Sequence, residues 1–360
     1  MEEENIQRKR LYRPIVLEGG KLLPQSLKEF FETHPEVNVA IFAGKGGLGK
    51  TTFSAATAHW LAKKGKKVLC FSTDPQASLS DIFEKDLFGK GEQELANNLY
   101  VIEIDADRKI SAYQEEIKQK ILDMYTLDEL PPEIDEYIKS AAAEPAMHES
   151  ATFDAMADLV ANADYDFYIF DMPPFGHGVR MISMAQILDA WIEKIEETRK
   201  KAYEYNAVAA TLRGSTTEES QDAMINEITE IGKKLDLFTK FLSDPKKTAF
   251  FMVLIPERMA ILDTKRALEM FGKLNLKLSG IIVNQVYPVE LLQREELSDF
   301  LRNRITGQQE YLKDIWNDFR DHIRAICPMF DREPKGLEMI AKVADRVFEK
   351  PWLEGETSGE

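Results

Sequence analysis

The chain has 360 residues, 44% of them hydrophobic, which is enough to build the core of one large domain or two small ones. Its net charge of −16 argues against a nucleic-acid-binding surface of any size. The sequence has neither a run of about 18 uncharged apolar residues nor an apolar signal-peptide core at its start, so we read no membrane span and expect a cytoplasmic protein.

The two ends of the chain are predicted to lie outside the main domain. Residues 1–36 are charged and contain several prolines and glycines, with one short helical pattern at 26–34. Residues 351–360 end in the acidic stretch EGETSGE, which has the composition of a disordered tail. We therefore expect an N-terminal extension (1–36), a P-loop domain (37–350) and a tail (351–360).

Seven apolar, β-rich runs alternate with helical patterns in the main domain. Several runs show little alternation of polar and apolar residues, as strands covered on both faces do. The helical segments between them indicate parallel strands joined by crossover helices. These features predict a doubly wound, mostly parallel α/β sheet. The predicted strands are residues 37–44, 67–74, 98–105, 166–174, 248–256, 277–286 and, more weakly, 324–330.

Two insertions interrupt this alternation. Residues 107–163 separate the third and fourth predicted strands, and residues 178–245 separate the fourth and fifth. Both contain apolar residues at helical spacing, so we expect a helical subdomain on the sheet. Such stripes are usually core, and a groove for a hydrophobic client is the alternative interpretation.

The stretch GKGGLGKTT at residues 44–52 indicates a phosphate-binding loop, because an apolar run precedes it and a helical pattern follows. Its glycines let backbone N–H groups converge on phosphate oxygens, and the helix N-terminus adds a partial positive charge. We expect Lys50 to reach the β- and γ-phosphates of ATP and the Thr51 hydroxyl to bind Mg²⁺.

Two aspartates end predicted strands and are candidates for the same site. Asp171 ends the run DFYIFD, where Mg²⁺ and its waters need an acceptor; a helix-capping or turn aspartate is the alternative. Asp74, in FSTDPQAS, could orient or deprotonate an attacking water; a cap for the following helix is the alternative.

Lys45 is a second lysine that the phosphate loop does not need for its own nucleotide. A lysine on the outer rim of such a loop can reach across a dimer interface and neutralise charge on the partner's nucleotide, as an arginine finger does. The alternative is a solvated surface lysine.

Several stretches resemble one known family. KGGLGKT (45–51) resembles the deviant Walker A motif shared by nitrogenase reductase, the septum-site and plasmid-partition ATPases and the arsenite-pump ATPases. FSTDPQASLSDIF (71–83) and DMPPFGHGVRMI (171–182) resemble the two switches of the branch formed by arsenite-pump and tail-anchored-protein-targeting ATPases. IPERMAILDTKRAL, GIIVNQVYP and CPMFDREPKGLEMI resemble its later blocks, so the resemblance runs from about Val37 to about Phe348.

The resemblance implies a P-loop NTPase fold, a Mg²⁺-dependent ATP hydrolase and roles for individual residues. Lys45 would be the intermolecular lysine, Asp74 the catalytic aspartate, and Asp171 the Mg²⁺-side aspartate acting through water. The implied nucleotide-binding residues of the loop are Gly44, Lys45, Gly46, Gly47, Leu48, Gly49, Lys50, Thr51 and Thr52. The implied switch residues are Asp74, Pro75, Asp171, Pro174, Gly176 and His177.

The resemblance also assigns residues outside the loop and the switches. Asn284 would contact the adenine, and Pro328 would line the base pocket. Glu257, in IPER, would link the nucleotide site to the opposite protomer.

Two metal-binding features of the branch are missing. Targeting factors hold a zinc ion between protomers through a Cys-x-x-Cys pair, and Ser298 and Leu301 stand at the corresponding positions here, so no zinc is expected. Cys70 and Cys327 are the two cysteines of the sequence, so the chain cannot supply the three thiols that arsenite sensing uses.

The function implied by the resemblance is that of a chaperone-like ATPase for membrane-protein targeting. A homodimer joined through the nucleotide face would bind and release a hydrophobic transmembrane segment and meet a membrane receptor, with no nucleic-acid partner. The alternatives are an ATPase of the same scaffold that serves metal or anion handling or metallocentre maturation, and a paralogue with a different protein client.

Overall fold

The computed structural model describes residues 25–349 apart from 75, 76, 126, 128, 143, 144, 163, 173–239, 243, 275 and 295. The chain divides into two compact units. Met1–Ile104, Tyr165–Phe175 and Pro245–Glu360 make up the first, and Asp105–Asp164 with Gly176–Asp244 make up the second.

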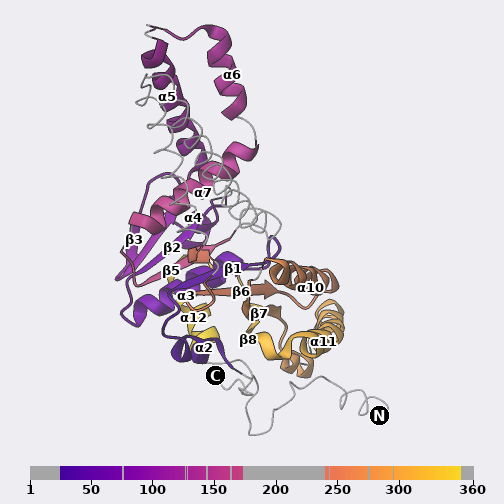
Figure 1. Ribbon diagram of the computed structural model, residues 1–360. Coiled ribbons are helices and arrows are strands. Elements are labelled where there is room, and N and C mark those ends of the chain that lie inside the picture. Colours follow the sequence, from indigo (N-terminus) through magenta and orange to yellow (C-terminus); the bar gives the residue numbers. More distant parts are fainter. Residues whose placement is uncertain are drawn as a thin grey trace, which may run out of the picture. The chain divides into compact units, whose positions relative to one another are not determined.

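An eight-stranded sheet forms the centre of the first unit, in the order β3-β4-β2-β5-β1-β6-β7-β8 (Figure 1). Neighbouring strands are parallel except for β3 and β4, which are antiparallel. The prediction of a doubly wound, mostly parallel α/β sheet is therefore confirmed. The strands are β1 (Val39–Ala43), β2 (Val68–Ser72), β3 (Gln93–Ala96), β4 (Leu99–Glu103), β5 (Phe167–Asp171), β6 (Thr248–Leu254), β7 (Leu278–Val286) and β8 (Ile323–Pro328).

One strand of the sheet, β3, is not among the predicted runs. Its residues QELA are exposed or half-exposed, so a search for apolar runs does not find it. Its pairing with β4 is irregular between Glu94 and Ala96. A short, polar and irregular strand is typical of the edge of a sheet, where it discourages pairing with other chains.

Helices cover both faces of the sheet because the chain leaves its centre in two directions. From β1 the chain crosses to β2, whereas from β6 it crosses the other way to β7 and then to β8. Right-handed crossovers therefore place α3 on one face and α10 and α11 on the opposite face, and Figure 1 shows them set apart. The helices of the first unit are α2 (Leu27–Thr33), α3 (Lys50–Lys63), α4 (Ser78–Phe83), α10 (Arg258–Lys273), η1 (Val289–Gln293), α11 (Asp299–Phe319), η2 (Arg320–His322), α12 (Gly336–Ala344) and η3 (Asp345–Glu349).

The short helix expected in the N-terminal extension forms and packs into the core. A capping box starts α2: the Ser26 hydroxyl accepts the N–H of Glu29, and the Glu29 carboxylate accepts the N–H of Ser26. Phe31 of this helix is buried and its ring contacts that of Phe251 in β6.

The described part of the second unit is mainly helical, with α5 (Ala106–Tyr125), α6 (Pro132–Ala142) and α7 (Pro145–Asn162). These helices come from the predicted insertion at 107–163, and Lys109 of α5 pairs with Asp154 and Asp158 of α7 at 3.0 and 2.7 Å. Most of the other predicted insertion, 178–245, lies outside the described residues. No helix that the structure describes combines the length and the apolar composition needed to cross a membrane.

Candidate active site

The predicted phosphate loop joins the end of β1 to the first residue of α3. Gly49 is the N-cap of α3 and has a φ of 98°, in the left-handed region that favours glycine. A Cβ at Gly49 would lie 2.5 Å from Nδ2 of Asn284, and a Cβ at Gly44 would lie 2.7 Å from the carbonyl oxygen of Val253. Both ends of the loop are therefore held against β6 and β7 at positions where only glycine fits.

The middle of the loop is open. Apart from the adjoining residues of the loop, no atom of the described residues lies within 4 Å of the place that a Cβ would take at Gly46 or at Gly47. Leu48 is buried, and Thr52 is half-buried in the first turn of α3. The loop therefore has free space beside the N-terminus of α3, where phosphate groups bind in proteins.

Lys50 lies inside the loop. It is only 7% exposed, and its Nζ donates a hydrogen bond to the backbone carbonyl of Lys45 at 3.2 Å. Burial lowers its pKa, and the negative charges of Asp171 and Asp74 partly oppose this effect. A buried ammonium group with one neutral acceptor is ready to exchange that acceptor for an anionic oxygen.

Asp171 is the centre of a hydrogen-bond network at the end of β5. Its Oδ2 accepts the hydroxyls of Thr51 at 2.8 Å and Ser78 at 3.2 Å, and its Oδ1 accepts that of Ser54 at 3.2 Å. Burial raises its pKa from 3.8 to about 6, against the hydrogen bond from Thr51 and the charge of Lys50. Ser54 and Ser78 are not predicted from the sequence, although one lies a turn after the loop motif and the other in the first switch.

The oxygen atoms of Thr51 and Asp171 suit Mg²⁺. This ion prefers hydroxyl, carboxylate and water oxygens, and in phosphoryl-transfer sites it takes one or two protein ligands together with phosphates. In the part of the chain that the structure describes, no three His, Cys, Asp or Glu side chains could hold a metal by themselves. The donor set therefore fits an ion that arrives with its nucleotide better than a resident metal.

Asp74 follows β2, next to this network. Its N–H is accepted by the hydroxyl of Ser72 at 3.1 Å, and its charge acts on Lys50. The N-cap of the following helix, α4, is Ala77, so the alternative interpretation of Asp74 as that cap residue is wrong. The switch residues Pro75, Pro174, Gly176 and His177 lie outside the described residues.

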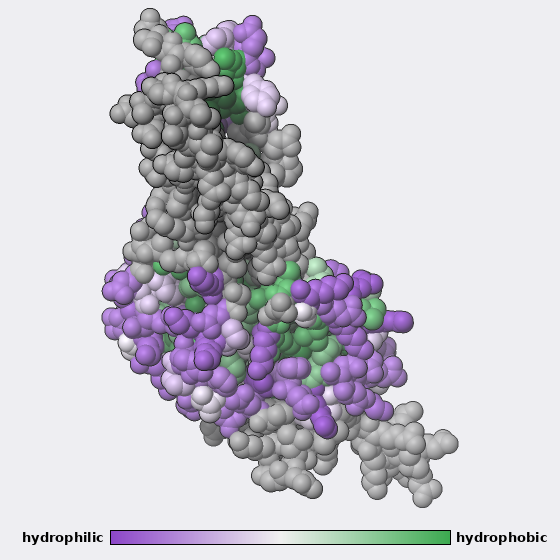
Figure 2. Space-filling view, viewed as in Figure 1, coloured by the Kyte–Doolittle hydropathy of each residue, from purple (hydrophilic) through white to green (hydrophobic). Residues whose placement is uncertain are grey.

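Lys45 points away from its own loop. Its side chain is 55% exposed, and its Nζ lies 3.6 Å from Oδ2 of Asp263 on α10. Met259 and Leu262 of the same helix are exposed, and Figure 2 shows hydrophobic residues at the surface in the region of α10. This rim of the site combines charged and apolar side chains, as protein contact surfaces do.

The residues predicted to contact the base lie at the ends of β7 and β8. Asn284 is buried, and its Nδ2 donates to the carbonyl of Leu48 at 2.9 Å, which ties β7 to the phosphate loop. Pro328 ends β8 and pairs in register with Val286. These residues therefore lie on the side of the loop opposite to Asp171 in the strand order.

Two further predicted positions are helix N-caps. Glu257 precedes α10 and its carboxylate lies 3.7 Å from the guanidinium of Arg304 on α11. Ser298, one of the two positions that the resemblance aligns with a cysteine pair, caps α11 by accepting the N–H of Leu301 at 3.4 Å.

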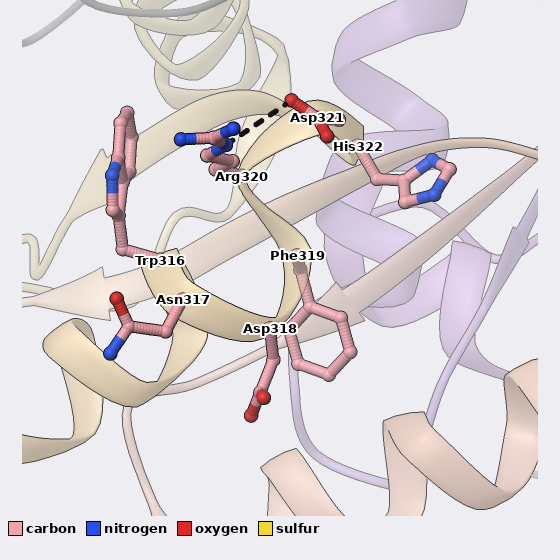
Figure 3. Close-up of a pocket in the computed structure, with 7 residues that line it drawn as sticks. All are labelled: Trp316, Asn317, Asp318, Phe319, Arg320, Asp321 and His322. Carbon is pink, nitrogen blue, oxygen red and sulfur yellow. Dashed lines mark ion pairs between the residues drawn. The ribbon is translucent and has the colours of Figure 1, made fainter.

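A pocket of about 380 Å³ lies away from these residues, at the C-terminal end of α11. It is lined by the consecutive residues 316–322, and Figure 3 shows their side chains fanning out around the turn, with an ion pair between Arg320 and Asp321. A ligand site has polar groups that converge. The geometry therefore favours the phosphate loop, and not this pocket, as the active site.

Comparison with known proteins gives one family and several relatives over nearly the whole chain. The sequence model of the anion-transporting ATPase family matches residues 37–349. A putative arsenical pump-driving ATPase 2 from Aquifex aeolicus is 31% identical over 306 residues, which cover 84% of this chain and 97% of that protein. The ATPase ASNA1 homolog 2 from Paramecium tetraurelia is 29% identical over 337 residues, which cover 90% of this chain and 97% of that protein.

Proposed function

The chain belongs to the anion-transporting ATPase family and is an ATP hydrolase, and on this premise we propose that it works as a nucleotide-switched homodimer. ATPases of this family are typically dimeric. In the proposed dimer each phosphate loop supplies Lys50 to its own nucleotide and Lys45 to the nucleotide of the partner.

The roles of the inner residues follow from their positions. Lys50 exchanges the carbonyl of Lys45 for the β- and γ-phosphate oxygens. Thr51 and Asp171 hold Mg²⁺, which when bound neutralises charge on those phosphates. Asp74 accepts a hydrogen bond from the attacking water and orients it toward the γ-phosphate. Asn284 contacts the adenine, in the pocket that Pro328 lines.

The observation that carries the proposal is the divergence of the two lysines. The side chain of Lys50 lies inside the loop, whereas the side chain of Lys45 points outward and lies near Asp263 on the exposed rim. To bind the phosphates of its own loop, the Lys45 side chain would have to leave Asp263. In its present position it is accessible to a second copy of the chain. Glu257, at the same rim, is the second residue that we assign to contact across the dimer.

The direct test is Lys45→Ala. Hydrolysis should fall by about a thousandfold, the usual effect of losing a charge supplied in trans, while binding of a fluorescent ATP analogue stays within a few fold. Lys63→Ala is the matched control, because Lys63 is also exposed and lies 3.6 Å from an aspartate, Asp345. A Lys45→Ala enzyme with the native rate would contradict the trans mechanism.

Mixing two inactive variants separates a role in trans from a role in cis. A Lys45→Ala protomer keeps Asp74 and can receive Lys45 from an Asp74→Asn partner, so each mixed dimer has one complete site. Random mixing should restore about a quarter of the wild-type rate, since half of the dimers are mixed and half of their sites work. Failure to restore activity in confirmed mixed dimers would place Lys45 in its own site.

For the cellular task we propose binding and release of a hydrophobic segment by the helical second unit. Ile117 of α5 and Ile134 and Tyr137 of α6 are exposed, and exposed apolar side chains on one helical unit are typical of a contact surface. Differential affinity of the open and closed dimers for such a client would couple it to ATP.

The experiment is co-expression with a panel of transmembrane segments, followed by co-purification with and without ATP. Retention that ATP alters would support targeting, and failure of ATP-competent dimers to retain any segment would contradict it. The alternative, metal or anion handling, predicts instead that an added metal ion or oxyanion stimulates hydrolysis. Neither outcome changes the assignment as an ATP hydrolase.

A further inference from the structure

Three polar residues stand side by side at the carboxyl ends of β4, β2 and β5. The strand register pairs Ser72 with Glu103 on one side and with Asp171 on the other. All three are buried, with at most 2% of their surface exposed. We name Glu103, Ser72 and Asp171 the polar row.

Among the described residues that lead into α4, the N-cap residue gives this helix no side-chain cap. The N-cap of α4 is Ala77, which has a φ of 52° and no side chain that could accept a hydrogen bond. Instead the Glu103 carboxylate accepts the N–H of Leu79 at 2.6 Å and also the hydroxyl of Ser80. A negative charge at the N-terminus of a helix satisfies free N–H groups and interacts favourably with the helix dipole. A neighbouring strand therefore supplies the missing cap.

The other two members of the row hold the beginning of the same segment. Ser72 accepts the N–H of Asp74 at 3.1 Å, and its hydroxyl lies 3.3 Å from that of Ser78. Ser78 donates in turn to Oδ2 of Asp171. Asp74 and the first turn of α4 are therefore both attached to the sheet by the polar row.

The bond from Ser78 to Asp171 and the bonds from α4 to Glu103 differ in what else their acceptors contact. Oδ2 of Asp171 accepts both Ser78 and Thr51, the residue proposed to hold Mg²⁺, so a change at Thr51 changes the acceptor of Ser78. The described hydrogen bonds of the Glu103 carboxylate go to α4 alone, and β2 separates Glu103 from Asp171.

We propose that Glu103 is a positioning residue for hydrolysis, the fixed anchor of the first turn of α4, and that the bond between Ser78 and Asp171 is the releasable one. Asp171 would give up the Ser78 hydroxyl when Mg²⁺ binds with nucleotide, because its Oδ2 would then face the ion. Leu79 stays bonded to Glu103 and Asp74 stays bonded to Ser72, so the release of Ser78 shifts Asp74 over a short distance only. This inference rests on the proposed function, because it needs Mg²⁺-nucleotide at Thr51 and Asp171.

The test is amide hydrogen exchange of the full-length protein with ADP in EDTA and with ADP plus Mg²⁺. In the wild type, Mg²⁺ should change exchange in peptides covering 73–78 by about threefold or more and leave the Leu79 amide protected. Ser78→Ala should abolish the Mg²⁺-dependent change. Ser54→Ala is the matched control, because it removes a hydroxyl at the same 3.2 Å from Asp171 but on α3, and the change should persist.

Glu103 is tested by a pair of variants. Glu103→Ala should deprotect the Leu79 amide and lower kcat by about tenfold with KM nearly unchanged, because a lost cap misplaces Asp74 and not the phosphate loop. Glu103→Gln retains an oxygen that accepts the N–H of Leu79 and should restore most of kcat. Thermal melts show whether each variant folds. If Glu103→Ala does not fold, the kinetics of Glu103→Gln and the hydrogen exchange of Ser54→Ala and Ser78→Ala still test the proposal.

The outcomes separate this inference from the function on which it rests. A wild type whose nucleotide binding ignores Mg²⁺ would contradict the proposed function. A wild type that binds Mg²⁺-ADP without any change at 73–78, or equal responses of Ser54→Ala and Ser78→Ala, would overturn the releasable bond alone. A fall in kcat together with a comparable rise in KM for Glu103→Ala, without rescue by Glu103→Gln, would show that Glu103 has only a structural role.

Discussion

The inner side and the outer rim of the phosphate loop differ strongly, although Lys45 and Lys50 are only five positions apart in the sequence. On the inner side, Lys50, Thr51 and Asp171 are buried or half-buried. Within one chain, Lys50 donates to the carbonyl of Lys45 and Thr51 donates to Asp171. On the rim, Lys45 meets Asp263 at 3.6 Å and Glu257 meets Arg304 at 3.7 Å, all of them near the surface. The polar groups of the inner side find their partners within one chain, whereas the charged groups of the rim are accessible to a second chain.

This difference has an energetic meaning. Exposed ion pairs contribute about 0.2–1 kcal/mol each and are screened by salt, so a partner can rearrange the rim at little cost. Hydrogen bonds to a buried carboxylate are worth about 1.5–3 kcal/mol each, so the inner network changes only when a ligand replaces the bonds it breaks. The rim is therefore suited to association and the inner side to chemistry.

The largest expected effect on nucleotide binding follows from removing the inner lysine. Lys50→Met should weaken ATP binding by about 100-fold or more, because at least two charged hydrogen bonds to phosphate are lost. The same change should raise the melting temperature of the nucleotide-free protein, since it removes a charge whose burial is unfavourable.

Lys45→Met is the control that sharpens this comparison. It replaces an exposed lysine and should leave both the melting temperature and ATP binding nearly unchanged. Titration with a fluorescent ATP analogue and thermal melts measure the two properties. Equal shifts in melting temperature for the two variants would show that the inner and outer lysines do not differ in the way that the structure shows.

The next effect concerns pH. The pKa of Asp171 is raised to about 6 by burial, so its carboxyl group binds a proton between pH 4 and 6 in the folded protein but not in the unfolded one. Stability of the metal-free protein should therefore fall as pH rises through this range. Mg²⁺ needs the carboxylate, so Mg²⁺-dependent nucleotide affinity should be about tenfold lower at pH 5 than at pH 7.

Asp171→Asn tests this assignment, because an amide has no proton to exchange in this range. The variant should lose the pH dependence of both stability and Mg²⁺-dependent affinity between pH 4 and 7. Melting temperatures and nucleotide titrations at a series of pH values provide the measurement. Persistence of the same pH dependence would assign it to another group.

The sequence predicts the inner side of the loop well because its signals are local. Gly49, Lys50 and Thr51 are consecutive, and their spacing from Gly44 is set by the backbone turn itself. Asp171 can also be predicted, because it ends an apolar run and parallel strands end at one edge of the sheet. The sheet follows from the apolar runs for the same reason, whereas the polar edge strand β3 does not.

Contacts between distant segments could not be predicted. The hydrogen bond from Asn284 to Leu48 joins residues 236 apart, and it depends on how far β7 extends beyond β6. The polar row depends on the register of β4, β2 and β5, which no single stretch encodes. Hydroxyl groups such as that of Ser78 carry no pattern of their own and become meaningful only when the strand ends are aligned.

The smallest expected effect belongs to the rim, and it asks whether the pairing of Lys45 with Asp263 competes with reaching a partner. Asp263→Asn removes the charge that holds Lys45 within its own chain. Because the pair is exposed, its loss should strengthen nucleotide-dependent dimerisation by only about two- to fivefold. Analytical ultracentrifugation with a non-hydrolysable ATP analogue measures the dimer dissociation constant.

Salt and a matched variant show whether this small effect has the proposed cause. The gain should vanish at about 1 M salt, where the Debye length shortens to about 3 Å and the rim pair is screened in the wild type as well. Asp345→Asn removes the partner of Lys63 at the same 3.6 Å, away from the loop, and should leave dimerisation unchanged. In the wild type, Asp263 also lies 3.6 Å from Arg266, so it keeps a positively charged neighbour when Lys45 turns toward the partner. Weaker dimerisation of Asp263→Asn would reverse the interpretation, because Asp263 would then itself bind the partner.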